Sequence, residues 1–330
     1  LEGCCRLLLI VSRMIVHMPP PVPSHPPTVG LVLAGGLARR MGGGDKPLTK
    51  IGGATIEKVE ELCAAGFRPN RMFPRFDQEA FDAQKGWMVP DHVEAGSDRL
   101  VGSVHTWVVK TGRHTILIDT CLGNDKKERR IPTWNDRTGP FLADLAAAGF
   151  PRESIDTVLC THLHVDHVGW NTSLVGGKWM PTFAKARYVF GKTEFEHWRD
   201  HSDEPDKVAV FNDSVKPIAD AGKADLVASD AQLSDEITLI PTPGHSPGHM
   251  SILIESDNET GLLTGDVAHH PCQMAHLDWS STADSDPKQS ATTRRELFSR
   301  FADTPTLVIG GHFNAGHIKR DGDAFKFMAV

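Results

Sequence analysis

The sequence predicts an α+β protein in which two packed β-sheets are covered by helices. Three observations lead to this class. Short apolar runs typical of strands fall into two groups along the chain, helical segments lie between the strands, and histidine or aspartate residues follow several strand ends. The composition agrees with a globular protein, because 40% of the 330 residues are hydrophobic and 23% are charged.

The first group of strands opens with a hairpin. Two runs rich in β-branched residues, Ser103–Val109 and His114–Asp119, are separated by a short turn that contains Gly112. Because the runs are adjacent and the turn is short, we expect them to pair. Further along this half we expect helices over Phe141–Ala148 and Glu194–Asp200 and a short buried strand over Asp156–Thr161.

The second group of strands occupies the C-terminal third of the chain. Its members are short apolar runs bounded by Gly, Pro, Asp or Ser, which are the residues typical of strand ends. We expect strands at Glu236–Ile240, Met250–Glu255, Gly261–Thr264 and Thr306–Ile309, the last of these being the final core strand, and a helix over Ala291–Phe301.

Residues 1–50 are predicted to be a leader outside the domain, which spans residues 51–330. The leader holds two apolar runs, Leu7–Val11 and Met14–Val16, which are far shorter than the ~20 residues of a membrane span. A proline-rich run follows them where a signal peptide would have its cleavage site. We therefore expect no membrane partner and a cytoplasmic location, with secretion left open.

Residues 29–48 read VGLVLAGGLARRMGGGDKPL, a short apolar strand that runs into a glycine-rich turn. Such a turn lets backbone N–H groups approach a phosphate. The LAGG, RMG and DK elements resemble the opening of molybdenum cofactor guanylyltransferases. Because the resemblance ends with this segment, we expect a fused remnant without activity. A nucleotide-binding protein that acts through this segment stays as an alternative.

The charge balance argues against a nucleic-acid partner. The chain has 35 Lys and Arg residues against 42 Asp and Glu residues, a net charge of -7, whereas a protein that grips a phosphate backbone needs a basic face. Its six cysteines are scattered and form no CxxC pair, so neither a disulfide scaffold nor a zinc ribbon is indicated. The informative count is 17 histidines, since imidazole is the commonest side-chain metal ligand.

The histidines concentrate in the motif THLHVDH at residues 161–167, directly after an expected strand. In extended backbone, side chains two residues apart share a face, so His162, His164 and Asp166 can converge, and a turn would bring His167 beside them. Buried imidazoles and carboxylates need polar partners, and a divalent metal ion satisfies all of them together. The alternative, a polar loop with incidental histidines, gives no reason for this density.

Three later strand ends each carry a candidate ligand beside a glycine. His245 lies in the proline-rich loop PTPGHSPGH, Asp266 ends the run GLLTGD, and His312 ends the run IGGH. Glycine has no side chain, so the backbone of each segment can approach its neighbours closely. Each segment alone is weak evidence, but their order behind the HxHxDH motif indicates a metal centre at the strand ends.

With these motifs the chain from about residue 51 to residue 330 resembles a metallo-β-lactamase-fold hydrolase. The resemblance implies a four-layered αβ/βα sandwich with two metal ions at the sheet edges. The ligands it implies are His162, His164 and His245 for the first ion, Asp166, His167 and His312 for the second, and Asp266 as a bridge between both. Imidazole and carboxylate ligands suit Zn²⁺, with Mn²⁺, Co²⁺ or Fe²⁺ as alternatives.

The same resemblance implies a mechanism. A hydroxide that bridges the two metal ions would attack the substrate, since such ions lower the pKa of bound water toward ~7. Asp166 would orient this hydroxide while it also binds the second ion. The sequence has no G-x-S-x-G motif that would supply a serine nucleophile. We expect a small-molecule substrate with a carboxylic ester or lactone bond, and phosphotriesters are a further candidate.

Two residues narrow the choice of substrate. Family members with a bridging aspartate such as Asp266 include lactonases, phosphotriesterases and glyoxalase II, whereas true β-lactamases generally lack it. The histidine at position 269 resembles the methyl parathion hydrolase branch of the family. The best-known acyl-homoserine lactonases have a tyrosine at this position instead. His269 would protonate the leaving group, contact substrate or donate a hydrogen bond to a ligand carboxylate. β-Lactamase and glyoxalase II-like thioesterase activities stay as alternatives, and homodimer formation stays open.

Overall fold

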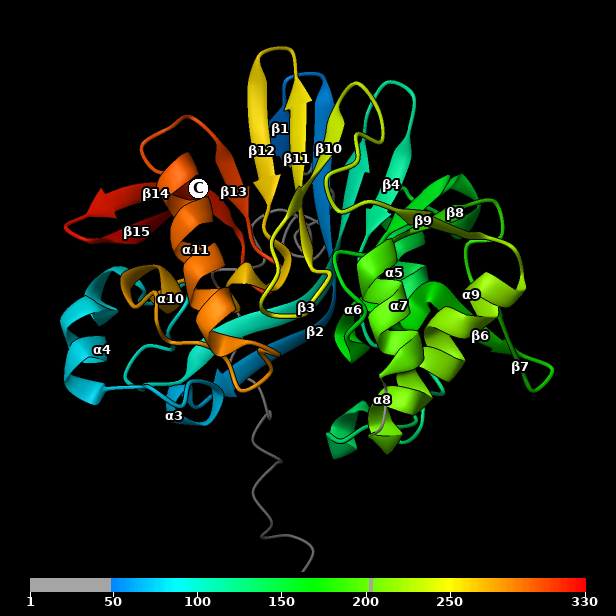
Figure 1. Cartoon of the computed structure of the whole chain (residues 1–330), viewed down its shortest axis with the longest axis horizontal. Coiled ribbons are helices and arrows are strands. Elements are labelled where there is room, and N and C mark those ends of the chain that lie inside the picture. Colours follow the sequence, from blue (N-terminus) through cyan, green and yellow to red (C-terminus); the bar gives the residue numbers. More distant parts are fainter. Residues whose placement is uncertain (1–48, 202–203) are drawn as a thin grey trace, which may run out of the picture.

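The computed structural model describes residues 49–201 and 204–330. Its centre is a pair of facing β-sheets with helices on both outer sides (Figure 1). Residues 1–48, which include the glycine-rich turn, lie outside the described residues. The division of the chain at residue 50 therefore stays a prediction. Among the described helices, none is both long and apolar enough to cross a membrane.

The first sheet has seven strands. In spatial order they are β1 (Thr49–Ile51), β2 (Ala54–Phe67), β3 (Leu100–Lys110), β4 (Thr115–Ile118), β5 (Thr157–Leu159), β8 (Arg187–Gly191) and β9 (Ala224–Val227). The expected hairpin is confirmed as the antiparallel pair β3 and β4, in which Trp107 lies opposite Ile118. From β4 to β9 the strands run parallel, so their carboxyl ends lie at one edge of the sheet.

The second sheet has six strands. In spatial order they are β10 (Ile237–Pro241), β11 (Met250–Ser256), β12 (Glu259–Leu263), β13 (Leu307–Ile309), β14 (Ala315–Asp321) and β15 (Ala324–Ala329). The expectation that β13 is the final core strand is wrong. β14 and β15 follow it as an antiparallel hairpin. Both strands belong to the core of this half of the molecule, because their residues Ile318, Phe325 and Phe327 are buried there.

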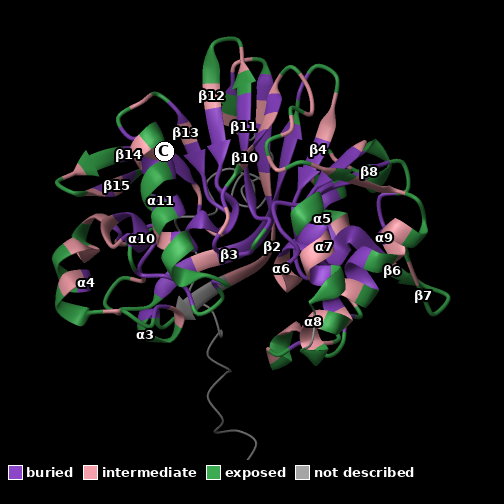
Figure 2. Ribbon diagram, viewed as in Figure 1, coloured by how far each residue is buried: buried purple, intermediate pink, exposed green. Residues whose placement is uncertain are grey.

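Successive side chains of each strand pack into different cores, one between the two sheets and one between a sheet and its helices. In β4, Ile116 belongs to the core between the two sheets, whereas Leu117 belongs to the core under the helices of the first sheet. In β11, Ile252 faces the first sheet and Leu253 faces the helices of the second. Successive side chains of a strand point to opposite faces, so both sheets are buried on both sides (Figure 2). The four-layered αβ/βα sandwich is thus confirmed.

Three helices confirm the expected helical segments and form the outer layers. α5 (Phe141–Ala147) and α7 (Lys192–Asp200) pack on the first sheet, and α11 (Pro287–Phe301) packs on the second (Figure 1). The other α-helices of the described residues are α3 (Pro69–Met72), α4 (Gln78–Gln84), α6 (Val165–Val168), α8 (Pro205–Val210), α9 (Lys216–Asp220) and α10 (Cys272–Ala275). A separate hairpin joins β6 (Thr172–Val175) to β7 (Lys178–Pro181).

The direction of the strands sets where the candidate ligands lie. β10, β12 and β13 run in one direction, because β11 is antiparallel to both β10 and β12 while β13 is parallel to β12. The segments that hold His245, Asp266 and His312 follow the carboxyl ends of these three strands, and the HxHxDH motif follows β5 in the other sheet. The candidate ligands therefore come from both halves of the sandwich.

Candidate metal centre

Segments from both sheets meet at this edge of the sandwich. The backbone joins the two halves directly, because Met250 N–H donates a hydrogen bond of 3.1 Å to Thr161 O. Gly311 allows the His312 segment to lie close to the carboxylate of Asp266. A Cβ atom on Gly311 would lie 2.6 Å from Asp266 Oδ1, so any larger residue there would push the His312 segment away from that carboxylate.

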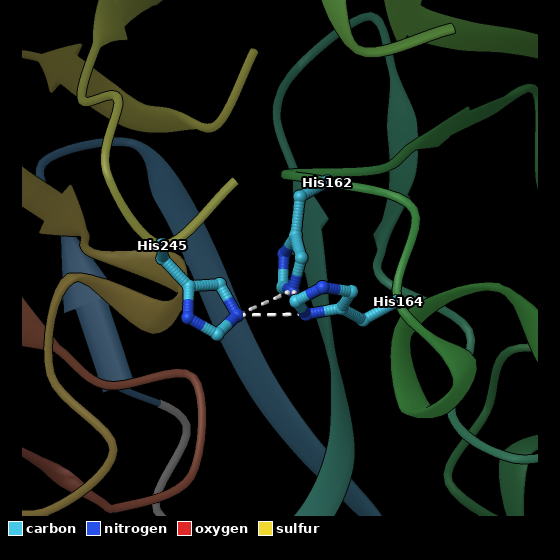
Figure 3. A group of neighbouring side chains, drawn as sticks. All are labelled: His162, His164 and His245. Carbon is cyan, nitrogen blue, oxygen red and sulfur yellow. Dashed lines mark hydrogen bonds between the residues drawn. The ribbon is translucent and has the colours of Figure 1, made fainter. Parts of the chain in front are cut away.

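His162, His164 and His245 form a first cluster (Figure 3). Nδ1 of His164 lies 2.8 Å from Nε2 of His245 and 3.1 Å from Nε2 of His162, and the two Nε2 atoms are 3.2 Å apart. Burial lowers the pKa of all three rings, that of His164 to about 4. The rings are therefore neutral at pH 7, and each has one nitrogen lone pair to offer.

Outer partners decide which nitrogen of a ring points into the first cluster. Burial raises the pKa of Asp284, but the hydrogen bond from His245 and the charges of His269, His245 and Arg294 together bring this pKa to about 2. The carboxylate accepts Nδ1–H of His245 at 2.8 Å. Thr161 donates its hydroxyl hydrogen to Asp119 at 2.9 Å and therefore accepts Nδ1–H of His162 at 3.0 Å. Both Nε2 atoms thus keep an inward lone pair.

Asp166, His167 and His312 form a second cluster. Nδ1 of His167 donates to Asp119 Oδ2 at 2.9 Å, and Nδ1 of His312 donates to Ser103 O at 3.0 Å. Their Nε2 atoms each lie 3.7 Å from a carboxylate oxygen of Asp166. Nε2 of His167 is buried and makes no hydrogen bond, which is costly unless another ligand satisfies it.

The position of Asp166 corrects one expectation. The sequence predicted extended backbone through this residue, so that it would share a face with the two histidines before it. Instead β5 ends at Leu159, and Val165–Val168 form helix α6. The turn of this short helix groups Asp166 with His167 and His312.

Asp266 lies between the two clusters. Its Oδ2 atom faces the Nε2 atoms of five histidines, at 3.1 Å from His312, 3.3 Å from His167, 3.4 Å from His269, 3.5 Å from His245 and 3.8 Å from His162. Its Oδ1 atom is buried without a hydrogen-bond partner. Burial raises the pKa of Asp266, but the charges of His312 and His167 hold it well below its ordinary value. One carboxylate therefore reaches both clusters.

The donor set fits divalent metal ions. In each cluster the ligand atoms lie within 4.8 Å of one another, and the outer hydrogen bonds leave imidazole lone pairs directed inward. Burial lowers the pKa values of His167 and His312, but nearby carboxylates raise them, to about 9 for His312. The carboxylates of the second cluster thus stabilise positive charge beside them, and either protons on the two histidines or a bound cation can supply that charge. Imidazole with carboxylate is a donor set typical of zinc and its neighbours.

His269 adjoins both clusters. Besides its contact with Asp266, its ring stacks on His312 at a centroid distance of 5.8 Å and meets His245 edge-on at 4.8 Å. Burial lowers the pKa of His269, and its Nδ1 atom is buried without a hydrogen-bond partner. Its backbone N–H donates to Gln273 Oε1 at 2.7 Å, which fixes the segment. This position is compatible with each of the roles left open for the residue.

Sequence reasoning missed two carboxylates that orient the histidines. Asp119 is 48 residues from His167, and Asp284 is 39 residues from His245. A usable indication existed for Asp119, which is the last residue of an expected strand; in the structure this strand, β4, pairs with β5 before the HxHxDH motif. Asp284 lies in a loop before α11, where no local pattern distinguishes this buried carboxylate from the exposed aspartates of other loops.

A four-layered αβ/βα sandwich with histidine and aspartate clusters at its edge defines a class of metal-dependent hydrolases. The model of the metallo-beta-lactamase superfamily matches residues 99–312, more than half of the chain, and the chain belongs to this superfamily. A curated relative, lactamase-like protein nscB of Trichophyton rubrum, is 30% identical over 186 residues, which cover 53% of this chain and 44% of that protein. The chain therefore spans less than half the length of this relative.

Two solved structures resemble the whole domain. One is hydrolase AbOPH of the beta lactamase superfamily and the other is AidC, a dizinc quorum-quenching lactonase. They are 21% and 20% identical to this chain, and each has a TM-score of 0.70 and covers 86% of this chain and 96% of its own. At this identity the likeness establishes the fold.

The glycine-rich segment has a relative of its own. A stretch of 31 residues is 77% identical to the molybdenum cofactor guanylyltransferase of Nitrobacter hamburgensis. The stretch covers 9% of this chain and 15% of that enzyme. The predicted resemblance is therefore confirmed, and it is confined to a short segment.

Proposed function

We propose that this metal-dependent hydrolase uses two divalent metal ions to cleave carboxylic esters or lactones, with phosphotriesters as a further substrate class. The observation that carries the proposal is the position of Asp266 Oδ2, which faces histidines of both clusters at 3.1–3.8 Å. A lactonase among the similar structures supports the choice of substrate class. The coarser assignment to metal-dependent hydrolases rests on the family itself.

The proposal assigns one ion to each cluster. His162, His164 and His245 would hold the first ion, Asp166, His167 and His312 the second, and Asp266 would bridge them. Zn²⁺ suits these ligands, with Mn²⁺, Co²⁺ or Fe²⁺ as alternatives. When bound, such ions supply Lewis-acid activation of a water molecule and of the scissile carbonyl or phosphoryl group.

The remaining roles belong to the chain's own groups. Asp119 and Asp284 hold Nδ1–H of His167 and His245, which fixes the ring tautomers before substrate arrives. Asp166 would accept a hydrogen bond from the attacking water and orient it toward the substrate. His269 would donate a proton to the leaving oxygen or contact substrate, or it would hold Asp266 in place across the 3.4 Å contact.

A substrate panel tests the proposal. It contains an aryl ester, γ- and δ-lactones, an acyl-homoserine lactone, a paraoxon-type triester, a cephalosporin and S-lactoylglutathione, each assayed with Zn²⁺ or Mn²⁺ and after metal removal. We expect ester or lactone hydrolysis to dominate and to disappear on chelation. Dominant turnover of the cephalosporin or of the thioester would favour the alternatives. Retention of full activity by metal-free protein would refute the proposal.

We also propose that residues 1–50 form a leader, of which only Thr49 and Lys50 contribute to the domain as the start of β1, and that residues 29–48 are a remnant without activity. The shortness of the guanylyltransferase match supports this, since a working nucleotidyltransferase needs a whole α/β domain behind its glycine-rich loop. Deletion of residues 1–48 should leave metal content and hydrolase activity unchanged. Binding of GTP by the full chain that disappears on deletion would contradict it, as would loss of folding.

A further inference from the structure

Glu194 is a buried carboxylate outside both clusters that accepts four hydrogen bonds. It lies in the first turn of α7 and is 1% exposed. Its Oε1 atom accepts from Leu163 N–H at 3.1 Å and from Trp198 Nε1–H at 2.6 Å. Its Oε2 atom accepts from the hydroxyl of Ser246 at 2.8 Å and from Gly248 N–H at 2.9 Å.

The two oxygens of Glu194 bind the two loops that carry the first cluster. Leu163 lies between His162 and His164, in the loop that follows β5 of the first sheet. Ser246 is the residue after His245, in the loop that follows β10 of the second sheet. One side chain thus joins loops of both sheets, through residues that directly adjoin His162, His164 and His245 in the sequence, and Figure 3 shows these three histidines facing one another.

Close packing reinforces this link. A Cβ atom on Gly248 would lie 2.3 Å from the backbone N of Glu194 and 2.6 Å from its Cα. The loop after β10 therefore rests directly on the first turn of α7, and only a residue without a side chain fits there. The position of the loop is defined twice, by the carboxylate and by the contact at Gly248.

The chemistry of the four partners calls for a carboxylate. Leu163, Trp198 and Gly248 present N–H groups, which can only donate, and both oxygens of an ionised glutamate accept. A glutamine would turn its NH₂ group toward Gly248 N–H in one orientation and toward Leu163 N–H in the other. Either orientation leaves a buried donor without an acceptor, which loosens one of the two loops.

We propose that Glu194 is a positioning residue that sets the metal affinity of the first cluster by holding its two ligand loops together. The inference rests on the proposed function, since it needs a metal ion at His162, His164 and His245. Loss of a partner bonded to a ligand side chain typically weakens metal binding by about 10–100-fold, and we expect an effect in this range because Glu194 fixes the backbone between His162 and His164 and the residue after His245. The second cluster receives no contact from Glu194 among the hydrogen bonds of the described residues, so its affinity should not change.

The test compares Glu194→Gln with Glu196→Gln in the full chain. Glu196 lies on the same helix, is partly exposed and pairs only weakly with Lys192 at 4.0 Å, so it controls for the same chemical change. Zn²⁺ affinities of metal-free protein are measured by chelator competition, and the Co²⁺ absorption spectrum reports ligand geometry. Both variants are also made with His312→Ala, which weakens the second site and leaves the first to be measured by itself.

We expect Glu194→Gln to weaken the first site by about 10–100-fold and to change its Co²⁺ spectrum, while the second site and Glu196→Gln match the wild type. Gly248→Ala, which displaces the loop and keeps the carboxylate, should have the same selective effect and serves as the readout if Glu194→Gln fails to fold. Affinities unchanged within about twofold in whichever variants fold, even with lower thermal stability, would refute the positioning role alone. A wild-type chain that binds no divalent ion would refute the proposed function, and this inference with it.

Discussion

Asp266→Asn should weaken both metal sites at once. The substitution keeps the shape of the side chain and removes the negative charge that lies 3.1 Å from His312, 3.3 Å from His167 and 3.5 Å from His245. Loss of an outer partner alone costs about 10–100-fold in metal affinity, or about 1.4–2.8 kcal/mol, and a shared ligand should cost each site at least as much. Turnover should fall by at least the roughly 10²–10³ that one preorganised electrostatic group contributes.

The assay counts ions per chain after desalting and measures kcat on the best substrate of the panel. Asp278→Asn is the matched control, because Asp278 is half exposed and pairs with Arg75 on the surface. His245→Ala and His312→Ala should each lose one ion and keep the other, whereas Asp266→Asn should lose both. If Asp266→Asn retains two ions and the turnover of the control, Asp266 is not a bridge and the reasoning fails.

Three further predictions follow from the same structure. Asp284→Asn removes the acceptor of His245 Nδ1–H. Chelator competition should show that the metal affinity of the first site falls by about 10–100-fold while that of the second site is unchanged. A first-site affinity equal to that of the wild type would contradict the orienting role of Asp284. His269→Ala should leave two ions per chain and lower kcat, most for substrates with poor leaving groups, if the residue acts on the leaving group; loss of metal would instead indicate support of the ligands. Burial lowers the pKa of Lys126 to about 7, so the unfolded chain binds more protons above pH 7 and the free energy of unfolding should rise with pH. Between pH 7 and pH 9 the free energy of unfolding, measured with denaturant, should rise by about 2 kcal/mol less in Lys126→Met than in the wild type. The variant Lys127→Met, which changes an exposed lysine, should show the same rise as the wild type. Identical pH slopes in all three proteins would disprove the assignment.

The elements that were predicted well have patterns that local sequence contains. The β3 and β4 runs are rich in β-branched residues, and α5 and α11 begin and end near recognisable helix boundaries. β2 was not predicted, since its sequence ATIEKVEELCAAGF is rich in Ala and Glu, which favour helix. Pairing with β3 along almost its whole length overrides that preference, and such long-range pairing leaves no local pattern.

The candidate site likewise contains residues that the sequence identifies and residues that only the structure shows. His162, His164 and His167 stand in one motif, and Asp266 and His312 follow strands, so residue type and strand ends were enough to find them. Of the supporting carboxylates, Asp119 ends an expected strand, whereas Asp284 and Glu194 could not be recognised from the sequence. Glu194 binds partners 31 and 54 residues away, and it looks in the sequence like any acidic residue in the first turn of a helix. Its role follows only from burial and from the four donors that converge on it.

The proposed function requires two metal ions that share Asp266. Anomalous diffraction from crystals of the full chain grown with Zn²⁺ tests it most directly. We predict two peaks, one among His162, His164 and His245 and one among the residues of the second cluster, with Asp266 between them. A single peak, or two peaks of which neither contacts Asp266, would contradict the claim.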